Sequence, residues 1–396
     1  MQTPTQTQAE PPTAQPNPPP PFAAHAEIQR HRTPGMELVV VKSAPVSELH
    51  LTLTPHEGES TALLIQRLAR ALAPWEATIV RQIVFGSTKA QPVTLAALKQ
   101  AFDDPGTPLI WVEGASCRNH PIAGIQVHAV AGAKVRTLEN YHGTLARVWD
   151  DARATHCVLS ADGPTRTSAS PREQTTRTFE NLQAALAQTG MTMKDLARTW
   201  FFLDDILSWY GDFNRARNDF FARNELRAGS VPASTGVGGR NPAGSALTAA
   251  AWAVKTRDEK TSAVQVVPSP LQCAASSYGS AFSRAVEIHS AGFRQLLVSG
   301  TASIAPDGRT AHVGDVRAQI ELSMQVVEAI LASRRMSFAD VSRATVYFKS
   351  PSAAPVWEDW CARHEQPAMP VVCACCDICR SDLLFEIELD AIRPGT

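Results

Sequence analysis

The chain has 396 residues, enough for two or more domain-sized units with their own buried cores. Its 37 basic and 38 acidic residues nearly cancel, so there is no strong field to attract a nucleic-acid backbone or an anionic membrane surface. No apolar run approaches the roughly 20 residues that span a bilayer. We therefore expect neither a nucleic-acid partner nor a membrane location.

The N-terminal stretch MQTPTQTQAEPPTAQPNPPPPF is rich in proline and glutamine. It lacks the basic and apolar regions of a secretory signal, and it has too few apolar side chains to fold. We predict a disordered tail over residues 1–35 and a cytoplasmic protein, in which the eight cysteines are reduced thiols. Residues 36 to about 130 are expected to form an α/β segment to which no chemistry is assigned.

Two later segments are copies of each other. QTTRTFENLQAALAQTGMTMKDLARTWFF, from residue 174, aligns without a gap to QIELSMQVVEAILASRRMSFADVSRATVYF, from residue 319. The same shift matches Gln174 with Gln319, Leu186 with Leu331, Met191 with Met336, Asp195 with Asp340 and Arg198 with Arg343. Such self-similarity indicates two copies of one supersecondary unit.

Each copy begins with a helix, since its apolar residues recur at helical spacing, and continues into a β-rich run, ARTWFFL or ATVYFKS. A second helix follows, most clearly in WYGDFNRARNDFF. Before the second copy, AVEIHSAGFRQLLVSGTASI predicts two strands joined by a glycine turn, and DLLFEIELDAI predicts a closing strand. The order β-β-α-β-α-β predicts an α+β domain with a mainly antiparallel sheet and helices on one face.

The linker between the copies is placed at TRDEKTSAVQ, residues 256–265. We therefore divide the chain after its tail into an N-terminal domain over 36–258 and a C-terminal domain over 266–396. The N-terminal domain contains the degenerate copy, at about 150–255.

The closing strand carries two glutamates on one face. Side chains alternate along a strand, so Glu386 and Glu388 point away from the face that the helices cover. The opposite, helix-covered face consists of Leu383, Phe385, Ile387 and Leu389. Burial favours the protonated form of a carboxyl group, as a general acid requires. An ion pair with Arg284, or with a neighbouring subunit, explains the two glutamates equally well from sequence.

Four of the cysteines precede this strand, in CACCDIC. Neighbouring thiols on an extended chain point to opposite sides, and no second knuckle lies nearby, which disfavours zinc. Cys376 and Cys379 form a CxxC pair without the helix N-terminus that lowers a thiol pKa. The better interpretation for Cys373, Cys375 and Cys376 is that they are buried structural thiols.

The region from 278 to 393 resembles the RidA/YjgF family, and residues 150 to 255 are similar to a degenerate copy of it. Four motifs together resemble the chorismatases, two-domain RidA-like enzymes that remove pyruvate from chorismate. They are PASTGVGG (232–239), YGSAFSRA (278–285), LLVSGTASI (296–304) and CDICRSDLLFEIE (376–388). RTWFFLDDILSWYGDFNRAR (198–217) is similar to the branch that makes hydroxybenzoates, the type tied to yellow pigment and ubiquinone precursors.

The resemblance implies roles for six residues. Glu386 matches the proton donor, and Cys379 matches a cysteine of the hydroxybenzoate-forming branch, with a role in proton transfer or positioning. The substrate has two carboxylates and needs cations and hydroxyl donors. The candidates are Tyr210, Arg217, Tyr278 and Arg284. PASTGVGG matches no phosphate-binding pattern and is interpreted as a glycine-rich turn that lines the cleft.

The resemblance implies conversion of chorismate to 3-hydroxybenzoate, with 4-hydroxybenzoate as a second candidate product, plus pyruvate. It implies neither a metal nor an organic cofactor, and it makes a homotrimer a candidate assembly. Three alternatives stay open: hydrolysis to a dihydroxycyclohexadiene carboxylate, imine deamination, and metabolite binding without catalysis. Deamination is disfavoured because RidA-like deaminases carry an arginine about fifteen residues before the strand glutamate, where this chain has Val371 and Val372.

Overall fold

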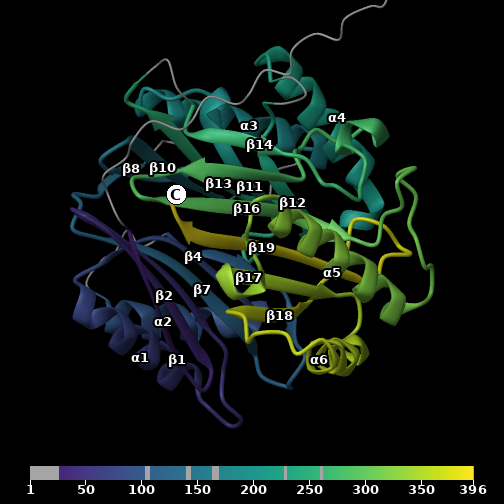
Figure 1. Ribbon diagram of the computed structural model, residues 1–396, viewed down its shortest axis with the longest axis horizontal. Coiled ribbons are helices and arrows are strands. Elements are labelled where there is room, and N and C mark those ends of the chain that lie inside the picture. The colour runs from purple at the N-terminus through teal and green to yellow at the C-terminus, as the bar shows by residue number, and fades with distance from the viewer. Residues whose placement is uncertain are drawn as a thin grey trace, which may run out of the picture.

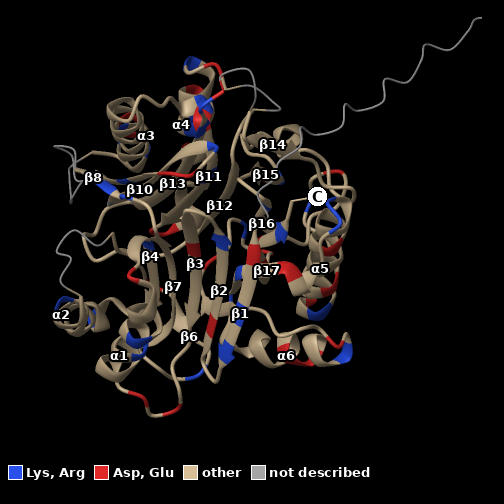
Figure 2. Ribbon diagram, turned by 60° about the vertical axis from the view of Figure 1, so that its left-hand side comes forward, with Lys and Arg blue, Asp and Glu red and all other residues tan. Residues whose placement is uncertain are grey.

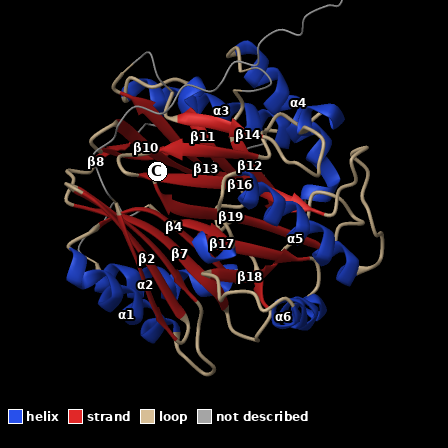
Figure 3. Ribbon diagram, viewed as in Figure 1, coloured by secondary structure: helices blue, strands red, loops and turns tan. Residues whose placement is uncertain are grey.

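The computed structural model describes residues 26–102, 108–139, 144–162, 169–226, 230–258 and 262–395. In these residues three β-sheets lie at the centre and the α-helices lie around the outside (Figure 1 and Figure 3). Apart from the short strand β6 (Ala115–Ser116), each sheet comes from one continuous part of the chain. The molecule is therefore three units in sequence order.

All three units have the element order β-β-α-β-α-β-β. The N-terminal unit contains β2 (Met36–Ser43), β3 (Val46–Leu53), α1 (Thr61–Leu72), β4 (Thr78–Gly86), α2 (Gln91–Ala101), β5 (Ile110–Val112) and β7 (Ile122–Ala131). The middle unit contains β9 (Thr144–Asp150), β10 (Ala154–Asp162), α3 (Pro171–Gln188), β11 (Leu196–Leu203), α4 (Ile206–Arg223), β12 (Ala233–Gly238) and β13 (Leu247–Thr256). The C-terminal unit contains β15 (Ala285–His289), β16 (Phe293–Ala302), α5 (Val316–Ser333), β17 (Val341–Phe348), α6 (Ala354–Arg363), β18 (Val371–Cys375) and β19 (Phe385–Pro394). The additional strands are β1 (Glu27–Thr33), β6 (Ala115–Ser116), β8 (Arg136–Glu139) and β14 (Val264–Val267).

The three sheets share one strand order. The orders are β2-β3-β7-β4-β5, β9-β10-β13-β11-β12 and β15-β16-β19-β17-β18. Within each core sheet the last pair is parallel and the others are antiparallel. This confirms the predicted α+β class with mainly antiparallel sheets. It also corrects the number of copies, because the segment at 36–130 is a third unit, and the predicted 36–258 domain contains two units.

The element order also differs from the prediction by one strand. A short parallel strand, β12 or β18, lies between the second helix and the closing strand. β12 contains ASTGVG, so the interpretation of this motif as a turn was wrong. β18 contains VVCAC, the start of the cysteine cluster. Both strands extend their sheet by pairing with the strand that precedes the second helix, and β6 pairs with the other side of β18.

The predicted tail over 1–35 ends earlier than expected. Residues 1–25 lie outside the described residues, whereas Glu27–Thr33 forms β1 and pairs along its whole length with β2. The chain turns between the two strands at Gly35, whose φ of 66° suits glycine. Backbone pairing explains why the polar sequence EIQRHRT is an ordered strand.

The outward face of each sheet packs against its helices. In the C-terminal unit, Ile320, Met324 and Val327 of α5 share a core with Phe385 and Leu389 of β19. This confirms the predicted helix-covered face for Phe385, Ile387 and Leu389. The prediction was wrong for Leu383, which precedes β19 and packs in a separate cluster with Ala302, Ile304 and Ile378. None of the described helices is long and apolar enough to cross a membrane.

The inward faces of the sheets carry buried charge. Arg81 of β4, Arg198 of β11 and Arg343 of β17 occupy equivalent positions, and their Cζ atoms lie 4.1, 4.9 and 5.5 Å from the ring centroid of Trp200. Buried guanidinium groups require carboxylate partners. Asp390 accepts hydrogen bonds of 2.8 and 3.3 Å from Arg343. Elsewhere acidic and basic residues are interspersed over all three units (Figure 2).

Candidate active site

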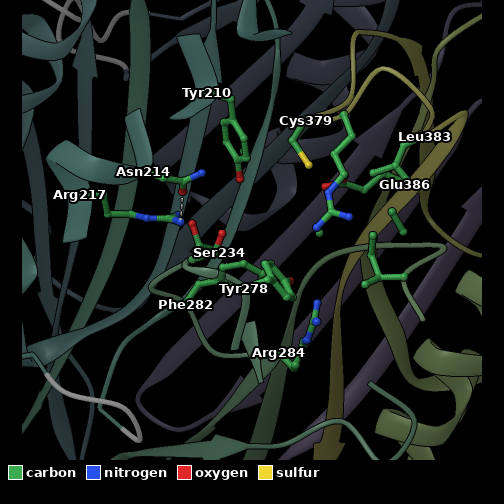
Figure 4. A pocket seen from close by; sticks show the side chains of 16 residues that line it. Tyr210, Asn214, Arg217, Ser234, Tyr278, Phe282, Arg284, Cys379, Leu383 and Glu386 are labelled. Carbon is green, nitrogen blue, oxygen red and sulfur yellow. Dashed lines mark hydrogen bonds between the residues drawn. The ribbon is translucent and has the colours of Figure 1, made fainter. Parts of the chain in front are cut away.

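A cavity of about 230 Å³ lies between the middle and C-terminal units (Figure 4). The middle unit contributes α4 and β12, and the C-terminal unit contributes the segment before β15, β16, and β19 with the loop before it. All six residues named from the sequence line it: Tyr210, Arg217, Tyr278, Arg284, Cys379 and Glu386. Their location together is a property of the fold, and their chemical roles remain predictions.

Glu386 is the acidic residue that lines this cavity. Burial and the negative charge of Glu388 raise its pKa to about 8, against the opposing charges of Arg198 and Arg284. No ion pair or hydrogen bond to its carboxyl group is found among the described residues. Glu386 is therefore protonated at neutral pH and can act as a proton donor.

Glu388 is in a different state although it shares the same strand face. Its carboxylate accepts hydrogen bonds from Arg198 Nη2 at 2.5 Å and Arg343 Nη1 at 2.8 Å. Burial raises the pKa of Glu388, but these two arginines outweigh it and hold the pKa below the ordinary value. The ion pair considered from sequence for both glutamates is therefore found, among the described residues, for Glu388 and not for Glu386. Its partners are Arg198 and Arg343 rather than Arg284.

Arg217 and Tyr210 point into the cavity from one face of α4, as their spacing predicted (Figure 4). Arg217 Nη2 donates to Asn214 Oδ1 at 2.6 Å, while its buried Nε has no hydrogen-bond partner among the described residues. Burial raises the pKa of Tyr210, which keeps its hydroxyl protonated. These groups supply one cation and one hydroxyl donor on this wall.

Arg284 supplies a second cation across the cavity. Its Nε donates to the Cys273 carbonyl at 3.0 Å, and its buried Nη2 has no hydrogen-bond partner in the described part of the chain. Its Cζ lies 5.4 Å from the Tyr278 ring centroid and 5.5 Å from that of Phe282. The Phe282 ring also lies 5.8 Å from the Arg217 Cζ, so both guanidinium groups lie near the same ring. The cavity thus has two cationic walls suited to a dianion.

Cys379 lines the cavity from the loop before β19. Burial, followed by the charge of Glu386, raises its pKa to about 12. The side chain is therefore a neutral thiol at pH 7, near the hydroxyl of Tyr210. This state suits a positioning or weak hydrogen-bonding role better than a role as a thiolate base.

Several lining residues were not identified from sequence: Asn214, Ser234, Phe282, Gly300 and Arg380. Asn214 lies between Tyr210 and Arg217 on α4 and could have been found from the same helical face. Ser234 belongs to the glycine-rich motif, whose predicted place at the cleft is confirmed. Arg380 Nη1 donates to the Gly308 carbonyl at 2.9 Å, an interaction that sequence spacing does not reveal.

The equivalent positions in the other units hold no carboxylate. Glu386 pairs across the sheet with Tyr347, as Gly124 pairs with Phe85 and Thr248 with Phe202. At Gly124, an added Cβ would lie 2.5 Å from a methyl group of Val372. Of these three positions, only that in the C-terminal unit carries an acid.

One group of side chains resembles a metal site by composition. The Glu48, His50 and His128 side chains are buried, and His128 Nε2 lies 3.1 Å from Glu48 Oε2. The two imidazole rings are stacked, however, with centroids 4.6 Å apart and planes inclined by 17°. A metal ion lies near the plane of each imidazole that binds it, so one ion cannot satisfy both rings as they are placed. The eight cysteines are free thiols.

Comparisons with known proteins agree with this architecture. The family model Endoribonuclease L-PSP matches residues 158–246 and 275–393. The chain is 28% identical over 218 residues to the 3-hydroxybenzoate synthase of Streptomyces hygroscopicus, covering 48% of this chain and 62% of that protein. It is 28% identical over 218 residues to a chorismatase of Streptomyces rapamycinicus, covering 49% of this chain and 63% of that protein.

A crystal structure of a chorismatase matches with a TM-score of 0.61 and 20% identity, covering 79% of this chain and 93% of that one. This likeness concerns the fold. The two relatives by sequence are each matched over less than two thirds of their length. Together these findings confirm the expected resemblance to the chorismatases and the repeated RidA-like domains.

Proposed function

Because this chain belongs to the Endoribonuclease L-PSP family, we propose that it is an enzyme of the chorismatase type, which removes pyruvate from chorismate. The observation that carries the proposal is the Glu386 carboxylic acid, protonated at neutral pH and facing a cavity with cations on two walls. A substrate with two carboxylates and an acid-labile enol ether fits these groups. The names of the two relatives support the same reaction.

The proposed substrate contacts follow from the free donors of the cavity. Arg217 and Tyr210 bind one carboxylate, and Arg284 binds the other through the Nη2 that has no partner in the described chain. Tyr278 packs against the Arg284 guanidinium and fixes its orientation. Holding both carboxylates orients the enolpyruvyl group toward Glu386 before reaction.

In the proposed reaction Glu386 protonates the methylene carbon of the enolpyruvyl group, which leaves an oxocarbenium-like centre at the ether carbon. The bond between the ring carbon and the ether oxygen then breaks, and pyruvate leaves with that oxygen as its keto oxygen. In the hydroxybenzoate branch the ring rearranges internally, loses a proton and becomes aromatic. One proton is taken up and one is released, so no water is consumed overall. Arg217 and Arg284 neutralise the two carboxylates throughout.

We propose 3-hydroxybenzoate as the main product, with 4-hydroxybenzoate as a minor one. Cys379 supports this choice because the hydroxybenzoate-forming chorismatases resemble this chain at that position. The neutral thiol occupies the cavity wall near Glu386, where a hydrolase must admit a water molecule. Hydrolysis to a dihydroxycyclohexadiene carboxylate is the competing outcome.

The test is incubation of the purified chain with chorismate, with pyruvate quantified and the ring products separated by chromatography. We expect hydroxybenzoate and pyruvate in equal amounts, and we expect both to disappear in Glu386→Gln, with circular dichroism as the control for folding. A non-aromatic diol would assign the chain to the hydrolytic branch. No turnover by the folded wild-type chain would contradict the proposed function.

A further inference from the structure

The hydroxyl group of Thr235, on β12, makes hydrogen bonds to residues of three other strands, β11, β16 and β19. Arg198 Nη2 donates to Thr235 Oγ1 at 2.6 Å, and the Gly300 backbone N–H donates to the same oxygen at 3.0 Å. Thr235 Oγ1 in turn donates to Glu388 Oε2 at 2.5 Å. Thr235 and Arg198 belong to the middle unit, whereas Gly300 and Glu388 belong to the C-terminal unit.

The polarity of these hydrogen bonds follows from their donors. A hydroxyl group has one hydrogen and two lone pairs. Guanidinium and backbone N–H groups can only donate, so they occupy both lone pairs of Thr235 Oγ1. The single hydrogen of Thr235 must therefore go to Glu388.

If the Glu388 carboxyl group were protonated, it would therefore find no hydrogen-bond acceptor in this network. Arg198 and Arg343 are donors only, and Thr235 has no free lone pair. The Tyr347 hydroxyl lies 3.4 Å from Oε1 and donates as well. The geometry thus requires an ionised Glu388, independently of any titration argument.

We propose that Glu388 is a positioning residue that, held ionised by Thr235 and Arg198 of the middle unit, keeps the catalytic proton on Glu386. Two carboxyl groups on the same strand face cannot both be ionised cheaply in a buried site. Because Glu388 stays ionised, Glu386 is the carboxyl group that holds the proton. The middle unit therefore sets the protonation state of an acid that belongs to the C-terminal unit.

The other groups around Glu386 do not reverse this assignment. The charges that act on Glu386 are those of Glu388 on β19, Arg198 on β11 and Arg284 before β15. Cys379 and Tyr210, which line the same cavity, remain neutral because burial raises the pKa of each. Burial also raises the pKa of Tyr347, so β17 contributes no further negative charge there.

This inference rests on the proposed function for its kinetic test, which compares the pH dependence of kcat in the wild type and in Glu388→Gln. Removing the charge of Glu388 lowers the pKa of Glu386, so we expect the upper pH limit of activity to move down by about one unit or more. Glu287→Gln is the matched control, because Glu287 on β15 is buried and forms ion pairs with Arg294 of β16 and with Arg334, which follows α5. An unchanged upper pH limit of activity in a folded Glu388→Gln variant would overturn the proposal.

Glu388→Gln leaves two buried arginines without their partner and could fail to fold. Thr235→Val and Thr235→Ser are therefore made in parallel, because they keep every charge. Thr235→Val should lower kcat about tenfold with KM within about threefold, and Thr235→Ser should recover most of the lost rate. Thr94→Val is the control, because Thr94 is buried in α2 and its hydroxyl donates to the Ala90 carbonyl of the same chain segment, at 2.8 Å. Equal rates in the two Thr235 variants would contradict the proposed role.

Infrared difference spectroscopy separates this inference from the proposed function. The carboxylic-acid band that is lost in Glu386→Gln should titrate near pH 8 in the wild-type chain and at lower pH in Glu388→Gln. This measurement needs no turnover, so it decides the inference even if chorismate is not the substrate. A Glu386 that is already ionised at about pH 6 would overturn the inference.

Discussion

Gly300 and Glu386 lie so close together that a Cβ atom on Gly300 would be 2.0 Å from Glu386 Oε1. Because Gly300 on β16 has no side chain, the Glu386 carboxyl group on β19 can occupy the space where a Cβ atom would otherwise lie. The two residues belong to neighbouring antiparallel strands, in which Ala302 pairs with Glu386 across a register shift. This close approach fixes where the proton of Glu386 can be delivered.

Gly300→Ala should consequently displace the Glu386 carboxyl group. We expect kcat to fall by at least about a hundredfold, because a displacement of about 1 Å can cost that factor. The measurement is steady-state pyruvate release. The control is Gly211→Ala on α4, where the added Cβ meets only Arg215 Nη1, at 3.6 Å, and helix propensity improves. Equal loss in both variants would contradict this prediction.

The rate should depend on pH through Glu386. Its pKa is raised to about 8, and the reactive form is the protonated one. Activity is therefore expected to be constant below that pH and to fall tenfold per unit above it. A profile of kcat between about pH 6 and pH 10 tests this, with circular dichroism at each pH as the control. A decline that begins near the ordinary glutamate pKa would be incompatible with the structure.

Cys379→Ala should change the product rather than abolish proton donation. Removing the thiol opens space beside Glu386 for a water molecule, so we expect the non-aromatic diol to increase and hydroxybenzoate formation to fall about tenfold. Chromatography of the ring products measures the ratio. Cys361→Ala on α6, a partly buried thiol outside the cavity, is the control. An unchanged ratio would remove Cys379 from product selection.

Arg217→Lys and Arg284→Lys should weaken substrate binding. Lysine keeps the charge but loses the planar fork that binds a carboxylate through two hydrogen bonds, so KM should rise about tenfold in each variant. Arg215→Lys is the control, because Arg215 lies on the same helix but is exposed and pairs with Asp212. If KM is unchanged in both cavity variants, these arginines do not bind the carboxylates.

The protein should be a monomer, in contrast to the homotrimer that the family resemblance makes a candidate assembly. Its three units already bury the inward faces of their sheets against one another, including Arg81, Arg198 and Arg343. A single chain thus supplies the contacts that separate one-unit subunits would otherwise make. Light scattering during gel filtration should give the mass of one chain, 42.7 kDa. Three times that mass would contradict the prediction.

The repeat was detectable in the sequence because matched residues make the same contacts in both copies. Gln319 Oε1 accepts the backbone N–H of Leu384, just before β19, at 2.8 Å. Gln174 Oε1 accepts the equivalent N–H of Ala246, before β13, at 2.9 Å. Both glutamines tie a helix start to the closing strand, so sequence preserves them. The unit at 36–130 escaped detection because it shares the topology but few of these side chains.

The sequence by itself determined the α+β class, two of the three units, most of the helix-covered face of the closing strand and six of the residues that line the cavity. Those features depend on local periodicity, on the repeat and on recognisable motifs. Only the tertiary structure decided that Glu386 keeps a proton while Glu388 does not. Two glutamates two residues apart look identical in sequence. Their difference comes from Arg198 and Thr235 of another unit, which donate hydrogen bonds to Glu388 and none to Glu386 among the described residues. Buried charge is governed by the groups that surround it in space, and no local pattern encodes them.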